Sequence, residues 1–155
     1  MNLAYTVAQA TIHDLDDLAA LFDRYRMFYK QPSDVEGAKQ FLWQRFNYGQ
    51  SVIFIARALA DRQAVGFTQL YPTFSSISMQ RLWVLNDLYV REEHRQQGIA
   101  EQLLQQGKQW ALQTKAKGVA LSTATDNVNG QALYEKFGFV KDTEFYHYFL
   151  SVPQV

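Results

Sequence analysis

One glycine, Gly98, stands between a run of polar residues and an apolar-patterned run, in the stretch HRQQGIAEQLL (94–104). A helix that starts after this glycine lacks a Ser, Thr, Asp or Asn cap, so its first backbone N–H groups stay open. Open N–H groups at the positive end of a helix dipole bind phosphates, and Arg95 adds a charged contact for the same anion. The stretch therefore indicates an anion site, although an ordinary strand–helix loop accounts for it equally well.

Other reactive groups are absent from the sequence or scattered along it. The chain has no cysteine, which excludes disulfides, cysteine-ligated zinc and a cysteine nucleophile. His13, His94 and His147 do not have metal-ligand spacing, so we expect no metal site and a solvated loop position for His94. Neither the GxGxxG dinucleotide motif nor the GxxxxGK[ST] phosphate loop occurs.

The composition limits the kind of protein and its partners. The 155 residues fit a single domain over 1–155. Lys plus Arg equals Asp plus Glu, 15 each, so we expect no nucleic-acid partner. No apolar run approaches the roughly 18 residues of a membrane span, and the N-terminus lacks a secretory pattern, so we expect no membrane association and a cytoplasmic location.

Hydrophobic periodicity predicts a mixed α/β (α+β) fold with helices on both faces of the sheet. Because a strand–helix–strand unit covers 82–125, one strand pair is expected to be parallel with a right-handed crossover, while hairpins make the other pairs antiparallel. The expected helices cover about 12–29, 33–48, 99–115 and 129–137. The expected strands cover 4–9, 51–59, 64–74, 80–91 and 119–125, with a final pair of short strands within 139–150.

A second motif, NVNGQALYEKFGF (127–139), follows the last central strand. The first motif reads Arg95-x-x-Gly98-x-Ala100, and the second reads Asn127-x-x-Gly130-x-x-Leu133-Tyr134-x-x-x-Gly138-Phe139. Together, in this order and at this spacing, they resemble the GNAT superfamily of acyl-CoA-dependent N-acetyltransferases. The resemblance is specific over roughly 80–140, and small-amine (diamine-type) members are the nearest in kind.

The resemblance implies a mostly antiparallel sheet of about seven strands, in which the parallel strands 82–90 and 119–125 splay apart. A β-bulge in the first of them causes the splay, and the cleft takes acetyl-CoA as co-substrate. Its acetyl carbonyl and pantetheine are expected on the backbone of Leu88, Tyr89 and Val90. The amides expected to cradle its pyrophosphate are those of Gln96, Gln97, Gly98, Ile99, Ala100 and Glu101, assisted by Arg95. Asn127 and Gly130 match the motif that contacts the cofactor arm.

The resemblance also implies catalytic roles for two side chains. Tyr134 matches the usual general acid, and a phenol of pKa about 10 stays protonated at neutral pH and can protonate a leaving thiolate. A packed aromatic is the alternative for this residue. Related enzymes often carry Leu-Glu-Asp on the central strand, but here the sequence is LNDLYV, so Asn86 replaces the first carboxylate. Asp87 remains as the candidate base; a water-mediated base, or none, is the alternative.

The expected acceptor is a small-molecule primary amine, contacted by Tyr29, Tyr71 and Asn86. A protein N-terminus, a lysine side chain or a non-catalytic CoA-binding role are the alternatives. The wider acceptor region includes Tyr25, Phe28, Phe74, Asp34 and Glu36, each of which has a packing or helix-capping alternative. The alternating segment FYHYFL (145–150) is expected to form an edge strand, and a homodimer through this edge is possible.

Overall fold

The computed structural model describes residues 3–155, and the chain clusters into two compact units that divide after Ser122. The first unit carries a sheet and three α-helices. The second, Thr123–Val155, carries one helix and a C-terminal segment. The single domain expected from length stays a prediction.

The helices and strands follow the expected order up to the last helix. The strands are β1 (Tyr5–Gln9), β2 (Val52–Ala58), β3 (Ala64–Ser75), β4 (Gln80–Val90) and β5 (Val119–Ala120); the α-helices are α1 (Leu15–Phe28), α2 (Val35–Asn47), α3 (Ile99–Gln113) and α4 (Val128–Phe137); and two short 3₁₀ turns are η1 (Ile12–Asp14) and η2 (Glu92–His94).

The sheet has five strands in the order β1-β2-β3-β4-β5. The first four are antiparallel neighbours, and β5 is parallel to β4 through Trp83 with Val119 and Val84 with Ala120. The mixed, mostly antiparallel sheet is therefore confirmed, but the seven strands were wrong. The two missing strands are the pair expected within 139–150, where the chain forms no strand. In addition, β5 is shorter than expected and ends at Ala120 rather than near 125.

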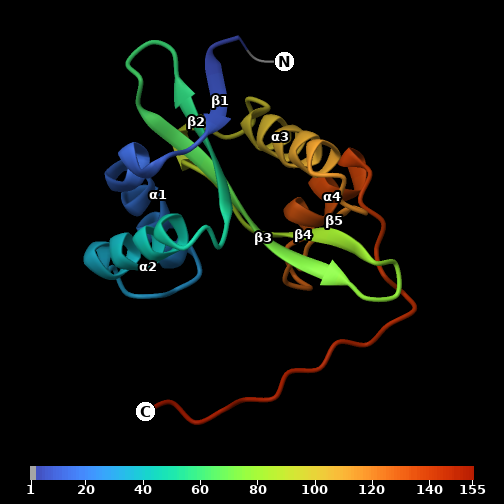
Figure 1. Cartoon of the computed structure of the whole chain (residues 1–155). Helices are drawn as coiled ribbons and strands as arrows, with labels where there is room; N and C mark the ends of the chain where they lie inside the picture. Colours follow the sequence, from blue (N-terminus) through green and yellow to red (C-terminus); the bar gives the residue numbers. More distant parts are fainter. Residues whose placement is uncertain (1–2) are drawn as a thin grey trace. The chain divides into compact units, whose positions relative to one another are not determined.

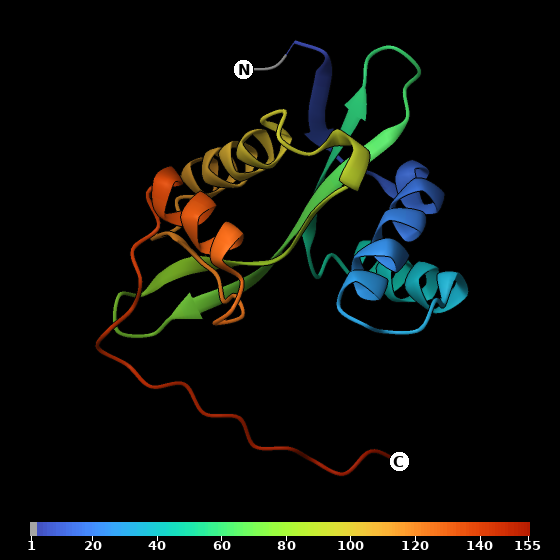
Figure 2. The same ribbon diagram turned by 180° about the vertical axis from the view of Figure 1, so that it is seen from behind.

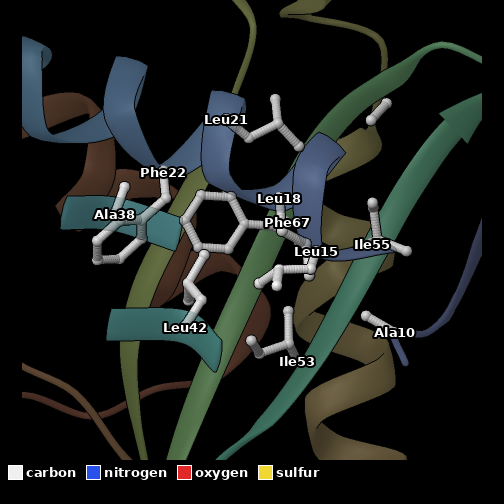
Figure 3. Close-up of a cluster of buried hydrophobic side chains, with 11 residues drawn as sticks. Ala10, Leu15, Leu18, Leu21, Phe22, Ala38, Leu42, Ile53, Ile55 and Phe67 are labelled. Carbon is white, nitrogen blue, oxygen red and sulfur yellow. The ribbon is translucent and has the colours of Figure 1, made fainter. Parts of the chain in front are cut away.

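Within the first unit, helices cover both faces of the sheet (Figure 1). Helices α1 and α2 lie on one face and α3 lies on the other, as the view from behind also shows (Figure 2). Because strand side chains alternate between faces, β2 presents Ile53 and Ile55 to α1, where Leu18, Leu21 and Phe67 complete a buried cluster (Figure 3). This packing fixes α1 over the middle of β3 and β4.

On the opposite face, α3 packs closely against β3 and β4. Gly107 has no side chain, and a Cβ there would lie 3.5 Å from Leu70. The Trp110 ring packs edge-on against Phe54 and Trp83, with centroids 6.2 and 5.8 Å apart. The sheet therefore holds the start of α3 at a fixed place relative to the end of β4.

The loop between α1 and α2 is tied to α1 by a buried carboxylate. Asp23 accepts hydrogen bonds from Ser33 Oγ (2.7 Å) and the Asp34 backbone N–H (2.6 Å). The sequence predicts a helix from about residue 33, but the N-cap of α2 is Asp34, whose side chain accepts a hydrogen bond from Gly37 N–H. Ser33 lies before the helix because its hydroxyl binds Asp23 instead.

In the second unit, α4 begins at a capped asparagine and ends at a glycine. Asn127 accepts a hydrogen bond from Gly130 N–H, and Gly138 adopts φ 120°. Phe139 then turns back on the helix, donating its N–H to the Tyr134 carbonyl at 2.9 Å. From there to the C-terminus the chain contains neither helix nor strand.

Candidate active site

Strand β4 contains one extra residue in its centre. Asp87 pairs with Gln69, but Leu85 pairs with the next residue of β3, Leu70, so Asn86 is left without a partner. This β-bulge bends β4 and re-aims the backbone on either side of it. It lies beyond the two residues through which β4 pairs with β5, so the parallel pair ends just before it.

The bulge brings Asp87 into a buried hydrogen-bond chain. Gln69 donates its Nε2–H to Asp87 Oδ2 at 2.8 Å, and Ser51 donates its hydroxyl to Gln69 Oε1 at 2.8 Å. Asp87 is 4% exposed and Gln69 is fully buried. Burial raises the pKa of the Asp87 carboxyl, while hydrogen bonds from Gln69, Tyr25 and Asn86 oppose the rise.

Asn86 and Asp87 differ sharply in exposure, although they are neighbours. The Asn86 side chain is exposed and donates its Nδ2–H to Asp87 Oδ1 at 3.1 Å. The Asn86 carbonyl accepts a hydrogen bond from the Tyr25 hydroxyl at 3.4 Å. Asn86, which stands where related enzymes have a carboxylate, therefore orients the Asp87 side chain.

Tyrosines surround the same carboxylate. Burial, with the negative charge of Asp87 as a second cause, raises the pKa of Tyr71 to about 12. The rings of Tyr25 and Tyr29 meet edge-on with centroids 5.2 Å apart, and Tyr25 also faces Tyr89 at 6.3 Å. The structure therefore brings Tyr71 and Asn86 to Asp87, and Tyr25 links this group to Tyr29.

Other expected acceptor-side residues lie elsewhere or have other uses. Phe74 pairs with Arg81 near the turn of the β3–β4 hairpin, far in register from Asp87. Asp34 caps α2, and Glu36 lies in the first turn of that helix. Asp34 therefore follows the capping alternative, whereas Phe74 is 68% exposed and contacts Arg81.

Beyond the bulge, β4 keeps its ladder with β3 but not with β5. Leu88, Tyr89 and Val90 pair with Thr68, Phe67 and Gly66, whereas the β5 ladder involves only Trp83 and Val84. The Val90 carbonyl already accepts a hydrogen bond from Arg95 Nε at 2.9 Å. The three predicted cofactor-binding residues therefore lie on one edge that β5 does not cover.

The start of α3 has the open geometry that the sequence indicated. Gly98 is its N-cap with φ 80°, and Gln96, two residues earlier, also has a left-handed φ of 60°. A Cβ on Gly98 would meet no protein atom within 4 Å. Ile99 is buried and anchors the helix, whereas Glu101 points its exposed side chain from the first turn. Backbone conformation, rather than crowding, requires the glycine.

The loop before α3 is held by β1, which the sequence did not predict. Tyr5 donates its hydroxyl hydrogen to Gln97 Oε1 at 2.8 Å, and the Tyr5 hydroxyl oxygen lies 3.0 Å from His94 Nδ1. The Tyr5 and His94 rings also meet edge-on at 5.8 Å. His94 is therefore half-buried rather than the solvated loop residue expected, and the exposed Gln97 side chain helps to hold the loop through its hydrogen bond with Tyr5.

Arg95 connects this loop to α1. Its guanidinium lies 5.4 Å from the centroid of Phe28 and 5.7 Å from that of Tyr89. Cation–π contacts of this kind hold the planar group in place while its edge stays exposed. The residue expected to contact phosphate is thus positioned between the donor loop and the helix that carries Tyr25 and Tyr29.

In the second unit, the expected motif residues form a helix start. Asn127 Nδ2 donates to Thr123 Oγ1 at 3.0 Å, and its Oδ1 accepts from Gly130 N–H at 3.1 Å. A Cβ on Gly130 would lie 2.4 Å from Asn127 Nδ2, so a larger residue there would require the Asn127 side chain to shift. Tyr134 is half-buried, and its ring meets Phe139 edge-on at 5.9 Å.

Sequence reasoning missed three residues of this region: Ser51, Gln69 and Tyr5. The pair Thr68-Gln69 inside the otherwise apolar strand AVGFTQLY was a usable signal, because buried polar side chains need partners. Tyr5 gave no local signal, since its partners are about 90 positions away in the sequence.

Among residues 3–155, no group of three or more His, Asp or Glu side chains is arranged to hold a metal ion. None of the helices described combines the length and hydropathy that crossing a bilayer requires.

Comparison with known families identifies the chain. The model of the family described as "Acetyltransferase (GNAT) family" matches residues 16–139. The chain belongs to the GNAT family. This match covers both motifs and the whole sheet except β1.

Relatives of this acetyltransferase agree with the assignment. The chain is 45% identical over 147 residues to "Uncharacterized N-acetyltransferase YhfO" of Bacillus subtilis, covering 95% of this chain and 97% of that protein. It is 30% identical to an aminoglycoside N(6')-acetyltransferase of Acinetobacter haemolyticus, covering 59% of this chain and 65% of that one. The crystal structure of a probable acetyltransferase, 45% identical, matches with a TM-score of 0.91 over 96% of this chain and 99% of that chain.

The chain is therefore an acyltransferase of the GNAT type, and this family uses acetyl-CoA. The start of α3 fits such a group, because Gly98 carries no capping side chain and leaves open space at the positive end of the helix. The diamine-type resemblance is not part of what the relatives show.

Gly98→Ala tests the role of the left-handed backbone at this position. A Cβ at φ 80° should lower the free energy of unfolding by about 1–2 kcal/mol. The substitution should also weaken CoA binding, because it displaces the first N–H groups of α3. Thermal unfolding and calorimetric titration with CoA measure both effects. Gly118→Ala is the matched control, because Gly118 also has open space but no positive φ. Equal CoA affinity in the two variants would contradict the anion-site assignment.

Proposed function

We propose that this enzyme transfers an acetyl group from acetyl-CoA to the primary amine of a small molecule, by direct attack in a ternary complex. The observation that carries the proposal is the bulge of β4, which holds the buried carboxylate of Asp87. The same strand continues through Val90 into the loop that opens α3. Strand β4 thus connects Asp87, which can accept a proton, with the start of α3, whose backbone can bind a phosphate.

The donor half of the proposal rests on the end of β4 and the start of α3. The amides from Gln96 to Glu101 would bind the pyrophosphate, and Arg95 would add a charged contact from its position over Phe28. The uncovered edge of Leu88, Tyr89 and Val90 would bind the pantetheine and the acetyl carbonyl, with a backbone N–H stabilising the oxyanion. The Val90 carbonyl is occupied by Arg95, so its N–H is the group available for this contact.

The acceptor half rests on the tyrosines around Asp87. An ammonium group is attracted to aromatic faces and to a carboxylate, and Tyr25, Tyr29 and Tyr71 supply those faces from α1 and β3. One relative is named as an aminoglycoside N(6')-acetyltransferase, whose acceptor is a small molecule, and this supports the same class of acceptor here. Asn86, exposed at the bulge, would donate or accept a hydrogen bond to this acceptor.

The proposed reaction begins with a proton transfer. The protonated amine loses a proton to Asp87, directly or through water, and its nitrogen then attacks the thioester carbonyl. The carbon–sulfur bond breaks, and the leaving thiolate takes a proton from the Tyr134 phenol. The amide and CoA leave, and proton exchange with solvent restores both side chains. Asn127 and Gly130 would hold the start of α4, the helix that carries Tyr134.

The activity is tested by following free CoA thiol while acetyl-CoA is mixed with a panel of acceptors. The panel contains aminoglycosides, diamines, amino acids and peptides with a free N-terminus or lysine. We expect thiol release with small amines and none with the peptides. Release with peptides alone would replace the small-molecule acceptor by a protein, and no release with any amine would contradict the proposed reaction.

Tyr134→Phe tests the general acid. The variant keeps the ring that packs on Phe139 but loses the proton, so kcat is expected to fall by about 10²-fold. CoA affinity should be unchanged in the same titration. Tyr48→Phe, at an exposed tyrosine of the α2 end, is the matched control and should keep full activity. If the Tyr134 variant turns over at the wild-type rate, the residue is a packed aromatic only.

Asp87→Asn tests the base through pH dependence. A base must be ionised, so kcat/KM is expected to fall as the pH drops through the Asp87 pKa, which burial raises above its ordinary 3.8. In the variant, kcat/KM should no longer fall at low pH in this way, and its value at high pH should be about 10²-fold lower than in the wild type. Asp61→Asn, in the exposed β2–β3 turn, is the control and should keep the wild-type profile. An unchanged limb in the Asp87 variant would point to a water-mediated base.

The same variant has a stability readout that is independent of turnover. The folded chain holds the Asp87 proton more tightly than the unfolded chain, because its folded pKa is raised. This group's contribution to unfolding free energy therefore declines as the pH rises from 3.8 through the raised pKa. Asp87→Asn should lack that decline in urea denaturation, and an identical decline in both proteins would contradict the raised pKa.

The cytoplasmic location and the homodimer both stay predictions from the sequence.

A further inference from the structure

Asp87, the base of the proposed reaction, is almost closed to solvent. The residue is 4% exposed, and amide groups occupy both of its carboxylate oxygens. Gln69 Nε2 donates to Oδ2 at 2.8 Å, and Asn86 Nδ2 donates to Oδ1 at 3.1 Å. A base must come within about 2.6–3.2 Å of the proton that it takes. An acceptor amine therefore reaches this carboxylate through an intervening group.

The two amides that hold Asp87 are unable to pass a proton to it. The nitrogen of a neutral side-chain amide donates hydrogen bonds and accepts none. Gln69 and Asn86 therefore orient the carboxylate without delivering a proton. A hydroxyl group, by contrast, both donates and accepts. It can give its own hydrogen on one side while it takes another hydrogen on the other side.

The Tyr25 hydroxyl lies between this buried carboxyl and solvent. It hydrogen-bonds to the Asp87 carboxyl and lies 3.4 Å from the Asn86 carbonyl oxygen. Because 3.4 Å is long for a hydroxyl donor, the carboxyl is the better acceptor for its single hydrogen. The Tyr25 side chain is half-buried and its contact with Asn86 is exposed, whereas the bond between Gln69 and Asp87 is buried. The Tyr25 oxygen is thus open to an acceptor that Asp87 does not meet.

Aromatic packing fixes the Tyr25 ring and therefore its hydroxyl. Ring centroids lie 6.1 Å away for Phe22, 5.8 Å for Phe67, 5.2 Å for Tyr29 and 6.3 Å for Tyr89. Phe22 and Phe67 belong to the buried cluster between α1 and the sheet (Figure 3). Tyr89 is one of the residues whose backbone is proposed to bind the thioester. The hydroxyl is therefore held beside both the base and the proposed thioester site.

Two other hydroxyl groups near Asp87 are less suited to proton transfer. The Tyr71 hydroxyl hydrogen-bonds to Gln69, so an amide separates it from the carboxyl. Thr68 donates its hydroxyl to the backbone carbonyl of Asp87 at 2.8 Å, not to the side chain. Of these three hydroxyl groups, that of Tyr25 meets the carboxyl.

We propose that Tyr25 is a catalytic residue, whose hydroxyl carries the proton of the acceptor amine to Asp87. An N–H bond of the ammonium breaks as its proton passes to the Tyr25 oxygen, and the Tyr25 O–H bond breaks as its own proton passes to the carboxylate. The amine becomes neutral, the phenol is regenerated and Asp87 becomes protonated. After the product leaves, transfer in the reverse direction to water restores the carboxylate. This relay rests on the proposed function, in which Asp87 is the base.

A double-mutant cycle tests whether Tyr25 and Asp87 act in one path. The panel amine that the wild type acetylates fastest is the probe, and kcat/KM is measured at neutral pH. Tyr25→Phe keeps the packed ring and should lower kcat/KM by about 10²-fold, as should Asp87→Asn. The double variant should be no worse than about 10²-fold, because both substitutions break the same path, whereas independent roles would multiply to about 10⁴-fold. A loss that multiplies would overturn the relay.

The pH dependence of the Tyr25→Phe deficit separates proton transfer from packing. An alkylamine is mostly protonated at neutral pH and arrives neutral above its own pKa, where it needs no relay before attack. The ratio of wild-type to variant kcat/KM should therefore shrink to about threefold or less as the pH rises toward about 10. Over this range Tyr71, whose pKa burial raises to about 12, keeps its proton, and Arg45 beside it keeps its charge. A ratio that stays constant with pH would overturn the relay.

Controls distinguish failure of the relay from failure of the proposed function. Tyr48→Phe, at an exposed tyrosine, should keep wild-type kcat/KM throughout, and calorimetric titration of Tyr25→Phe with CoA should give wild-type affinity. A wild-type rate in Tyr25→Phe with an impaired Asp87→Asn overturns the relay alone. A wild-type rate in Asp87→Asn overturns the base and the relay but leaves acetyl transfer standing. Absence of thiol release by the wild-type enzyme overturns the proposed function and the relay together.

Discussion

The hydrogen bond from Gln69 to Asp87 is the interaction on which the arrangement of the candidate site depends. It joins two buried polar side chains across β3 and β4 where the register shifts and Asn86 bulges out. A buried carboxylate without a donor is costly, so the bond, supported by Ser51, stabilises the bulge. The bulge in turn follows the end of the β4–β5 ladder, sets Asp87 among tyrosines, and leads β4 toward the open start of α3.

Two other supports hold this arrangement in place. The core between α1 and the sheet fixes Tyr25 over the bulge, and Arg95 ties the donor loop to Phe28 on the same helix. Tyr5 holds Gln97 and His94 from the opposite end of the sequence. The proposed donor and acceptor contacts therefore share α1 and β4, so a substitution that displaces one set of contacts would also displace the other.

Local patterns in the sequence predicted what depends on local physics. The helices from α1 to α4, the hairpin of β2 and β3, and the glycine at the start of α3 follow from periodicity and backbone preference. The exact N-cap of α2, the role of Tyr5 and the Gln69–Asp87 pair depend on partners that no short window contains. The count of seven strands failed because a strand needs a neighbour, and FYHYFL has the pattern without one. The motif roles of Tyr134 and Asn127 stay predictions that rest on family resemblance.

The most direct measurement is kcat/KM for acetyl transfer by Gln69→Leu, with CoA affinity measured on the same protein. We expect kcat/KM to fall by about 10²-fold or more, because Asp87 loses its hydrogen-bond donor and its position. CoA affinity should stay within about threefold, since the N–H groups of α3 are untouched. Wild-type kcat/KM in this variant, with the chain folded, would contradict the claim that the buried pair supports the reaction.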